Sequence, residues 1–311
     1  MLPGLIKGIR ERSRLSISKA ISLIENGSKD GAKLLSQIYK DTGNAYKIGI
    51  TGPPGAGKSS LTHSLISSFR SEGKRVAVIA VDPTSPFSGG AVLGDRIRMT
   101  SHFSDPDVFV RSMATRGGQG GLALKTQEVG EIFDAAGYDI IIFETVGVGQ
   151  IELDVIRATD TVLVVLVPES GDEVQMLKAG LMEIGDVFAI NKADRPGASK
   201  LVISLKNFLS THTFEDDKWP PEVVETIATE NKGLDDLVGS LYKHRAFSDE
   251  HGIQKRKIND RYRSRVFKII SDSLMDSFWK DNNILELDTE LEKAHRKRKS
   301  PYDFADKLIV K

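Results

Sequence analysis

A glycine-rich segment at residues 52–59 contains the side chains best suited to chemistry. It reads Gly-Pro-Pro-Gly-Ala-Gly-Lys-Ser and matches the phosphate-binding pattern G-x-x-x-x-G-K-[ST] at every fixed position. Glycines allow backbone N–H groups to close around a phosphate chain at the positive end of a helix. Lys58 is expected to reach the β- and γ-phosphates, and the Ser59 hydroxyl to bind Mg²⁺. The segment therefore predicts binding of a nucleoside triphosphate together with Mg²⁺.

The residues on either side of this loop fit the same interpretation. Residues 47–51 predict a short buried strand, and residues 61–69 predict an amphipathic helix. The alternative is a glycine-rich turn that binds no ligand, which the intact motif with both flanks disfavours. The nucleotide-binding residues predicted from the loop are Gly52, Gly55, Ala56, Gly57, Lys58, Ser59 and Ser60.

Acidic residues follow two further predicted strands. Asp82 ends the apolar run 76–81, and Glu144 follows the run 140–143. Ligands of open α/β sheets bind at the carboxyl ends of the strands. In phosphate-loop enzymes this place holds an acidic residue near Mg²⁺ and then a glycine, here Gly147, whose N–H can sense the γ-phosphate. A lone acidic residue at a strand end is more often solvated, but beside an intact phosphate loop the functional interpretation is favoured.

A motif at residues 191–194, Asn-Lys-Ala-Asp, predicts that the base is guanine. It fits the pattern N-K-x-D and follows a predicted strand two strand–helix units beyond Glu144. Asp194 can accept two N–H bonds from the guanine edge, where adenine offers no matching pair of donors. Asn191 and Lys192 are expected to brace the loop and the ring.

A later segment, residues 223–229, resembles the last base-contacting loop of guanine-nucleotide sites. Within it, the N–H of Ala228 is the expected donor to the guanine carbonyl. Specificity for ATP is the less favoured alternative, because it would leave the Asp194 carboxylate without its donors.

The residue after Gly147 predicts slow hydrolysis. Ras-like enzymes have a glutamine there that orients the attacking water. Val148 occupies the position here, and Gln150 lies two residues further on. Because a valine cannot position water, we expect intrinsic turnover on the order of 10⁻⁴ to 10⁻² per second, as in unassisted GTPases.

Composition excludes several function classes. The 311 residues include 43 Lys and Arg against 43 Asp and Glu, so a broad nucleic-acid or membrane-surface role has no electrostatic support. The chain has no cysteine, which excludes disulfides, thiolate catalysis and cysteine-ligated metals. No signal peptide is recognisable, and no apolar run approaches the roughly 18 residues that span a bilayer. We therefore expect a soluble, cytoplasmic protein.

Alternating strand and helix patterns predict an α/β fold, with a mostly parallel sheet covered by helices on both faces. We expect an N-terminal helical extension at residues 1–45, a nucleotide-binding domain at 46–244 and a helical segment at 245–311. Apolar residues recur at helical spacing between residues 258 and 278. Such a stripe is either packed within the chain or forms a dimer interface. The basic run 295–299 is interpreted as a solvated surface rather than a nucleic-acid site.

Five motifs together resemble a known family. They are Gly-Pro-Pro-Gly-Ala-Gly-Lys-Ser at 52–59, Val-Asp-Pro-Thr-Ser at 81–85, Gly-Gly at 89–90 with Leu-Gly-Asp-Arg at 93–96 and Arg-Met at 98–99, Glu-Thr-Val-Gly-Val-Gly-Gln at 144–150, and Asn-Lys-Ala-Asp at 191–194. The set resembles the MeaB/ArgK GTPases, which serve cobalamin-dependent acyl-CoA mutases such as methylmalonyl-CoA mutase. The older label of the family is LAO/AO transport system kinase, but no kinase-type catalytic loop is identifiable here.

The resemblance implies a P-loop NTPase fold with a SIMIBI-type G domain, helical extensions at both ends and a C-terminal arm that forms a homodimer. It also implies a chaperone whose GTP binding and hydrolysis to GDP gate cofactor loading and protect the mutase. Cobalamin is expected to come with that partner, since the chain has no cobalamin-binding module of its own.

The resemblance also implies roles for particular residues. Ser59, Asp82, Asp95 and Glu144 would surround Mg²⁺, and the catalytic set would be Lys58, Asp95 and Glu144. Asp172, Gln175 and Lys178 would form a further switch that signals to the mutase. On spacing alone, Asp172 could equally cap a helix while Lys178 is solvated.

Two other function classes remain as alternatives. One is a metal-insertion GTPase of the hydrogenase or urease maturation type, which needs a metal store that a chain without cysteine or a histidine cluster does not offer. The other is a nucleotide-dependent binding module in which hydrolysis is incidental, or a protein-targeting GTPase. The sequence names neither the mutase nor the geometry of a dimer.

Overall fold

A computed structural model describes residues 2–82, 102, 104–114, 122–145, 154–156, 159–168, 181–210, 218–280 and 282–309. The chain divides into two compact units, Met1–Lys255 and Arg256–Lys311. The first contains the sheet together with the N-terminal helices, and the second is helical.

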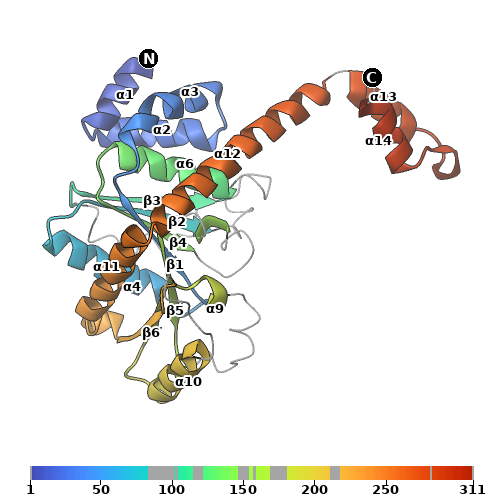
Figure 1. The fold of residues 1–311 in the computed structure, drawn as a ribbon. Coiled ribbons are helices and arrows are strands. Elements are labelled where there is room, and N and C mark those ends of the chain that lie inside the picture. The colour runs from blue at the N-terminus through green and yellow to red at the C-terminus, as the bar shows by residue number, and fades with distance from the viewer. Residues whose placement is uncertain are drawn as a thin grey trace. The chain divides into compact units, whose positions relative to one another are not determined.

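The first unit is built on a seven-stranded sheet of order β3-β2-β4-β1-β5-β6-β7, in which every pairing is parallel (Figure 1). The strands are β1 (Tyr46–Thr51), β2 (Val76–Asp82), β3 (Val108–Ala114), β4 (Ile140–Thr145), β5 (Thr161–Leu166), β6 (Val187–Asn191) and β7 (Glu222–Thr226). The central strands β4 and β5 are buried at all six positions, as their unbroken apolar runs predict for a sheet covered on both faces. Since all strands run the same way, their carboxyl ends share one edge.

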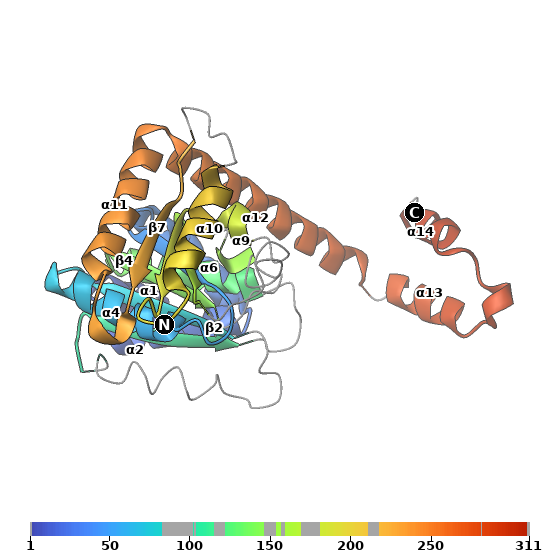
Figure 2. The same ribbon diagram turned by 90° about the horizontal axis from the view of Figure 1, so that it is seen from below.

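Helices cover both faces of this sheet (Figure 2). Helices α4 (Lys58–Ser71) and α11 (Leu234–Glu250) bury their apolar residues against one face. Helix α6 (Leu122–Ala135) packs against β2 and β4 on the other face, and α9 (Leu181–Ile184) and α10 (Ala198–Ser210) pack there against β5 and β6. The prediction of a parallel sheet between two helical layers is confirmed.

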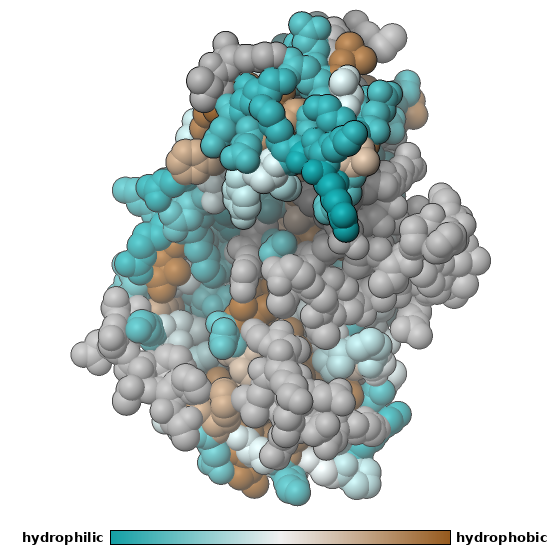
Figure 3. All heavy atoms as spheres, turned by 90° about the vertical axis from the view of Figure 1, so that its right-hand side faces the viewer, coloured by the Kyte–Doolittle hydropathy of each residue, from teal (hydrophilic) through white to brown (hydrophobic). Residues whose placement is uncertain are grey.

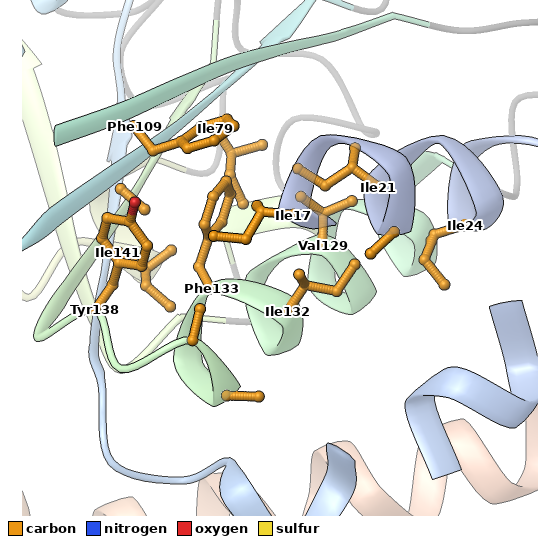
Figure 4. Packing of buried hydrophobic residues seen from close by; sticks show 14 of the residues in the cluster. Ile17, Ile21, Ile24, Ile79, Phe109, Val129, Ile132, Phe133, Tyr138 and Ile141 are labelled. Carbon is orange, nitrogen blue, oxygen red and sulfur yellow. The ribbon is translucent and has the colours of Figure 1, made fainter. Parts of the chain in front are cut away.

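The N-terminal helices form a further layer outside α6. These are α1 (Leu2–Arg10), α2 (Arg14–Glu25) and α3 (Lys29–Ile38), followed by the short helix η1 (Tyr39–Asp41). Ile17 and Ile21 of α2 meet Val129 and Phe133 of α6 in a fully buried cluster (Figure 4). The apolar face of α2 is therefore part of the main core.

A buried carboxylate fastens the linker between these helices and β1. Asp134, near the end of α6, accepts hydrogen bonds from the backbone N–H groups of Gly43, Asn44 and Ala45 at 2.9 to 3.0 Å. Its Oδ2 also lies 3.1 Å from the Lys47 ammonium, and its side chain is fully buried. One side chain thus satisfies three backbone donors and one cation.

The second unit contains most of α12 (Ile253–Phe278), then α13 (Asn282–Leu291), η5 (His295–Lys297) and α14 (Pro301–Ile309). Helix α12 buries none of its residues. Large apolar side chains that are exposed along it are Ile258, Tyr262, Val266, Phe267, Ile269, Ile270, Leu274 and Met275. Among the residues that Figure 3 colours, hydrophilic side chains are the more extensive, with apolar side chains in small groups between them. Among the helices that the structure describes, none is long and apolar enough to cross a membrane.

The basic run 295–299 has a partly structural role within this unit. The Arg298 guanidinium donates to the carbonyl oxygens of Leu291 and Lys293 at the end of α13, at 2.6 and 2.9 Å. The Lys299 N–H donates to the buried Glu290 carboxylate at 2.7 Å. The side chains of the run are exposed, as predicted, but Arg298 also closes the carbonyl end of a helix.

Candidate nucleotide-binding site

The phosphate loop lies between β1 and α4, in the strand–loop–helix order that the motif predicts. Gly52, Gly55 and Gly57 all have positive φ, at 147°, 78° and 82°. A Cβ on Gly52 would lie 2.1 Å from the carbonyl oxygen of Val165 in β5, and one on Gly57 would lie 2.4 Å from the amide nitrogen of Asn191. Glycine is required at both places, because the loop packs directly against the neighbouring strands.

Lys58 lies across its own loop. Its ammonium donates to the carbonyl oxygens of Gly52 and Pro53 at 2.8 and 3.0 Å, and the residue is buried. The positive charge is therefore held inside the ring of backbone that the glycines form. This is the position from which a lysine can contact phosphate oxygens.

Ser59 and Glu144 meet although they are 85 positions apart. The Ser59 hydroxyl donates to Glu144 Oε1 at 2.6 Å, and both residues are buried. Sheet order explains the contact, because β4 pairs directly with β1, with Ile50 opposite Glu144. A buried carboxylate and a hydroxyl at one point form the oxygen-only donor set that suits Mg²⁺, so the residues present fit that ion.

Other predicted metal ligands lie at or beyond the edge of what the structure describes. Asp82 ends β2 and pairs with Ala114, while the preceding Val81 lies opposite Thr145 of β4. The end of β2 therefore neighbours the end of β4 that carries Glu144. Asp95 and Gly147 lie outside the described residues, as do Ser170 through Lys178 with the three predicted switch residues.

Asn191 joins the base motif to the phosphate loop. Its Nδ2 donates to the carbonyl oxygen of Ala56 at 2.9 Å. Its Oδ1 accepts from the Ala228 N–H at 3.2 Å and from the Thr226 hydroxyl at 3.4 Å. One buried amide therefore touches the phosphate loop, the end of β7 and the loop that follows it. The Ala228 N–H, which the sequence predicts to face the guanine carbonyl, donates to Asn191 in this structure.

The remaining base-motif residues lie at the surface beside Asn191. Lys192 has a left-handed backbone, with φ of 57°, and the Ala193 N–H donates to the Thr226 carbonyl at 3.1 Å. Asp194 is exposed. A hydrogen bond from Lys232 to Glu230 raises the pKa of Lys232, and Asp194 adds to that shift. The Asp194 carboxylate thus lies within electrostatic range of the Lys232 ammonium.

Several residues that support the site were missed by sequence reasoning. The Ser64 hydroxyl of α4 donates to the Ala228 carbonyl at 2.9 Å, and the Thr145 hydroxyl contacts that of Thr51 at 3.2 Å beneath the loop. The signal for Ser64 is a polar residue within the apolar stripe of a helix, which usually indicates a buried hydrogen bond.

Two histidines, one of them on α4, pack against each other. The rings of His63 and His102 lie 4.4 Å apart, centre to centre, and His102 Nε2 lies 3.3 Å from the His63 carbonyl oxygen. Burial, and then the neighbouring His63, lower the pKa of His102. Within the described part of the chain, no three His, Cys, Asp or Glu side chains are grouped as a metal site.

Comparison with known proteins assigns the family. The family model described as methylmalonyl Co-A mutase-associated GTPase MeaB matches residues 17–283. The chain belongs to the MeaB family of GTPases. The resemblance drawn from the five motifs is therefore confirmed, and the MeaB match extends through helix α12.

Individual relatives agree with the MeaB assignment. A protein assigned as a GTPase in Pyrococcus abyssi is 45% identical over 314 residues, covering 99% of this chain and 96% of the relative. The mitochondrial methylmalonic aciduria type A homolog of Caenorhabditis elegans is 31% identical over 325 residues, covering 99% and 82%. A crystal structure of a LAO/AO transport system kinase superposes with a TM-score of 0.70 at 24% identity, covering 99% and 96%, which confirms the P-loop GTPase fold.

Proposed function

We propose that this MeaB-family GTPase binds GTP and GDP with Mg²⁺, hydrolyses GTP slowly, and uses that cycle as a chaperone of a cobalamin-dependent acyl-CoA mutase. The observation that carries the proposal is the match to a family defined by association with methylmalonyl-CoA mutase, over residues 17–283. The relative named for methylmalonic aciduria type A supports the same class of partner.

The site supports the nucleotide part of the proposal. The Lys58 ammonium lies inside the phosphate loop, where it can neutralise phosphate charge. Asn191 joins that loop to the base motif, so both ends of one nucleotide can be held by connected elements. The exposed Asp194 carboxylate is the group that would distinguish guanine from adenine.

Ser59 and Glu144, with Asp82 and Asp95, would hold the metal. When bound, Mg²⁺ neutralises charge on the β- and γ-phosphates. Lys58 stabilises the charge that develops on the transferred phosphoryl group. The buried hydrogen bond between Ser59 and Glu144 holds the oxygen atoms of these two side chains together at the N-terminus of α4. Val148 offers no group to orient water, so rapid hydrolysis would require the partner.

A homodimer is the second part of the proposal. Helix α12 presents large exposed apolar side chains at helical spacing, and none of its residues is buried. A second copy of the same helix is the partner that would cover them symmetrically. For the metal-insertion alternative, the described residues contain no group of three or more His, Cys, Asp or Glu side chains that could hold a metal ion.

Mutase binding measured in defined nucleotide states tests the proposal. The purified chain is loaded with a non-hydrolysable GTP analogue or with GDP, and its affinity for methylmalonyl-CoA mutase of the same organism is measured. We expect affinity to differ between the two states by at least about tenfold, since a nucleotide switch works only through differential binding. Equal affinity in both states, or no binding in either, would contradict the chaperone role.

Asp194→Asn is the matched control that tests whether the response depends on recognition of the guanine base. The amide offers a donor where the carboxylate offered an acceptor, so this variant should lose GTP and accept xanthosine triphosphate. Mutase binding should then respond to a xanthosine analogue and no longer to a guanosine analogue. Similar ATP and GTP affinities in the unmodified protein would refute the guanine assignment itself.

A further inference from the structure

Ser64 connects the helix of the phosphate loop to the loop expected to contact the base. It lies on α4, less than two turns beyond Lys58, and is 2% exposed. Its hydroxyl donates to the Ala228 carbonyl oxygen at 2.9 Å, across 164 positions of sequence. A buried serine hydroxyl aimed at a loop carbonyl is a specific contact, because it needs one rotamer and one loop position.

This contact closes a ring of hydrogen bonds around the site. Ala228 accepts from Ser64 and donates its own N–H to Asn191 Oδ1. Asn191 in turn donates to the carbonyl oxygen of Ala56 in the phosphate loop, which leads directly into α4 and back to Ser64. The two loops are therefore linked through Asn191 on one side and through Ser64 on the other.

The loop after β7 is closed upon itself by backbone hydrogen bonds. Ile227 and Lys232 exchange backbone hydrogen bonds at 3.1 and 3.3 Å. Asn231 has a left-handed backbone, and so has Gly233, where a Cβ would lie 2.0 Å from the Glu225 carbonyl oxygen. These internal hydrogen bonds fix the shape of the loop but not its distance from the phosphate loop. That distance is set by contacts with other elements, and the hydrogen bond from Ser64 is one of them.

We propose that Ser64 is a positioning residue for base recognition, which sets the distance between the base loop and the phosphate loop. The inference rests on the proposed guanine-nucleotide function and deepens it. Ser64 acts through Ala228, because its hydroxyl holds the residue 228 backbone at the place that Asn191 also requires. The Ala228 carbonyl additionally accepts from the Asn231 N–H at 3.4 Å, so removing the Ser64 hydroxyl displaces the loop without leaving that oxygen bare.

Binding of whole and partial ligands to Ser64→Ala tests this role. We expect the Kd for both GTP and GDP to rise about fivefold, which corresponds to the loss of one hydrogen bond in the binding-competent loop position. The Kd for inorganic tripolyphosphate, which has no base, should stay within about twofold. Single-turnover hydrolysis at saturating GTP should also be unchanged, since the phosphate contacts remain.

Two further variants separate positioning from general damage. Ser64→Thr keeps the hydroxyl and should restore most of the GTP affinity. Ser67→Ala removes an exposed hydroxyl of the same helix, which donates to the His63 carbonyl oxygen at 3.3 Å, and should leave the affinity for GTP and for tripolyphosphate unchanged.

Each other outcome has a distinct meaning. Equal weakening of tripolyphosphate and GTP would show that Ser64 merely stabilises α4, and would overturn the inference. Unchanged GTP affinity in Ser64→Ala would overturn it too, provided the unmodified protein binds GTP in preference to ATP. A protein without that preference would refute the proposed function instead.

Discussion

The buried Asp134 carboxylate allows a sharp test of how the N-terminal helices are attached. Replacing it by asparagine keeps the shape but turns one acceptor oxygen into a donor NH₂ group. Oδ1 serves two backbone N–H groups of residues 44–45, while Oδ2 serves the Gly43 N–H and the Lys47 ammonium. In either orientation of the asparagine side chain, its NH₂ group replaces one carboxylate oxygen of Asp134. The two donors that this oxygen served then lose a charged acceptor and face the NH₂ group instead.

The magnitude follows from these contacts. A hydrogen bond to a charged group contributes about 1.5 to 3 kcal/mol, so the loss of two predicts that Asp134→Asn lowers the free energy of unfolding by about 3 to 6 kcal/mol. Domains are stable by only about 5 to 15 kcal/mol, so the effect is large. Urea denaturation followed by circular dichroism measures it, with the midpoint and the slope compared between variants.

Asp41→Asn is the matched control. Asp41 pairs with Arg10 at 2.7 Å, but both side chains are partly exposed, so the expected loss is at most about 1 kcal/mol. A loss below about 1 kcal/mol for Asp134→Asn would refute the view that this carboxylate holds the linker. A separate early transition for the N-terminal helices would refute the view that they share one core with the sheet.

Three further predictions concern the site and its surroundings. Lys58→Ala should weaken GTP binding at least tenfold in a titration, whereas Glu144→Ala should mainly raise the Mg²⁺ concentration needed for turnover; small equal effects would mean that the metal site is misplaced. The pKa of His102 lies below its ordinary value of 6.5, through burial and then through His63. As the pH falls, the unfolded chain therefore takes up this proton before the folded protein does. The contribution of His102 to the free energy of unfolding is complete above about pH 6.5 and is lost as the pH falls towards the lowered pKa. His102→Asn should flatten this part of a plot of melting temperature against pH, and an unchanged plot would exclude the histidine pair as the source of the pH dependence. Finally, Lys178→Ala should leave GTP affinity nearly intact and abolish any acceleration of hydrolysis by the mutase, whereas a lower melting temperature with acceleration retained would indicate a merely structural residue.

Local patterns predicted the elements that carry the site. The apolar runs at 47–51, 76–81 and 140–143 became β1, β2 and β4, each extended by one or two residues. The phosphate loop and the base motif were recognisable because each is continuous in sequence and each follows a strand. Strand β3 was not predicted, and the beginning of segment 223–229 proved to be β7.

Contacts between distant segments could not be predicted in the same way. Asn191 reaches Ala56 across 135 positions, and no local pattern records that meeting. The same holds for Asp134, which serves a linker about 90 positions earlier, and for the His102 ring that packs on His63. Such contacts follow from strand order and crossover geometry, and a single sequence does not state either.

The order of strands in the sheet has a consequence for synthesis of the chain on the ribosome. β1 emerges early, yet both of its neighbours, β4 and β5, are encoded far downstream. The nascent phosphate loop therefore has no strand beside it, and its last brace through Ser64 waits for a residue 164 positions later. At typical elongation rates that interval lasts roughly 10 to 30 seconds, during which the apolar β1 segment must be kept from pairing elsewhere. The ring of hydrogen bonds through Asn191, Ala228 and Ser64 can therefore close only once the chain has been extended past Ala228.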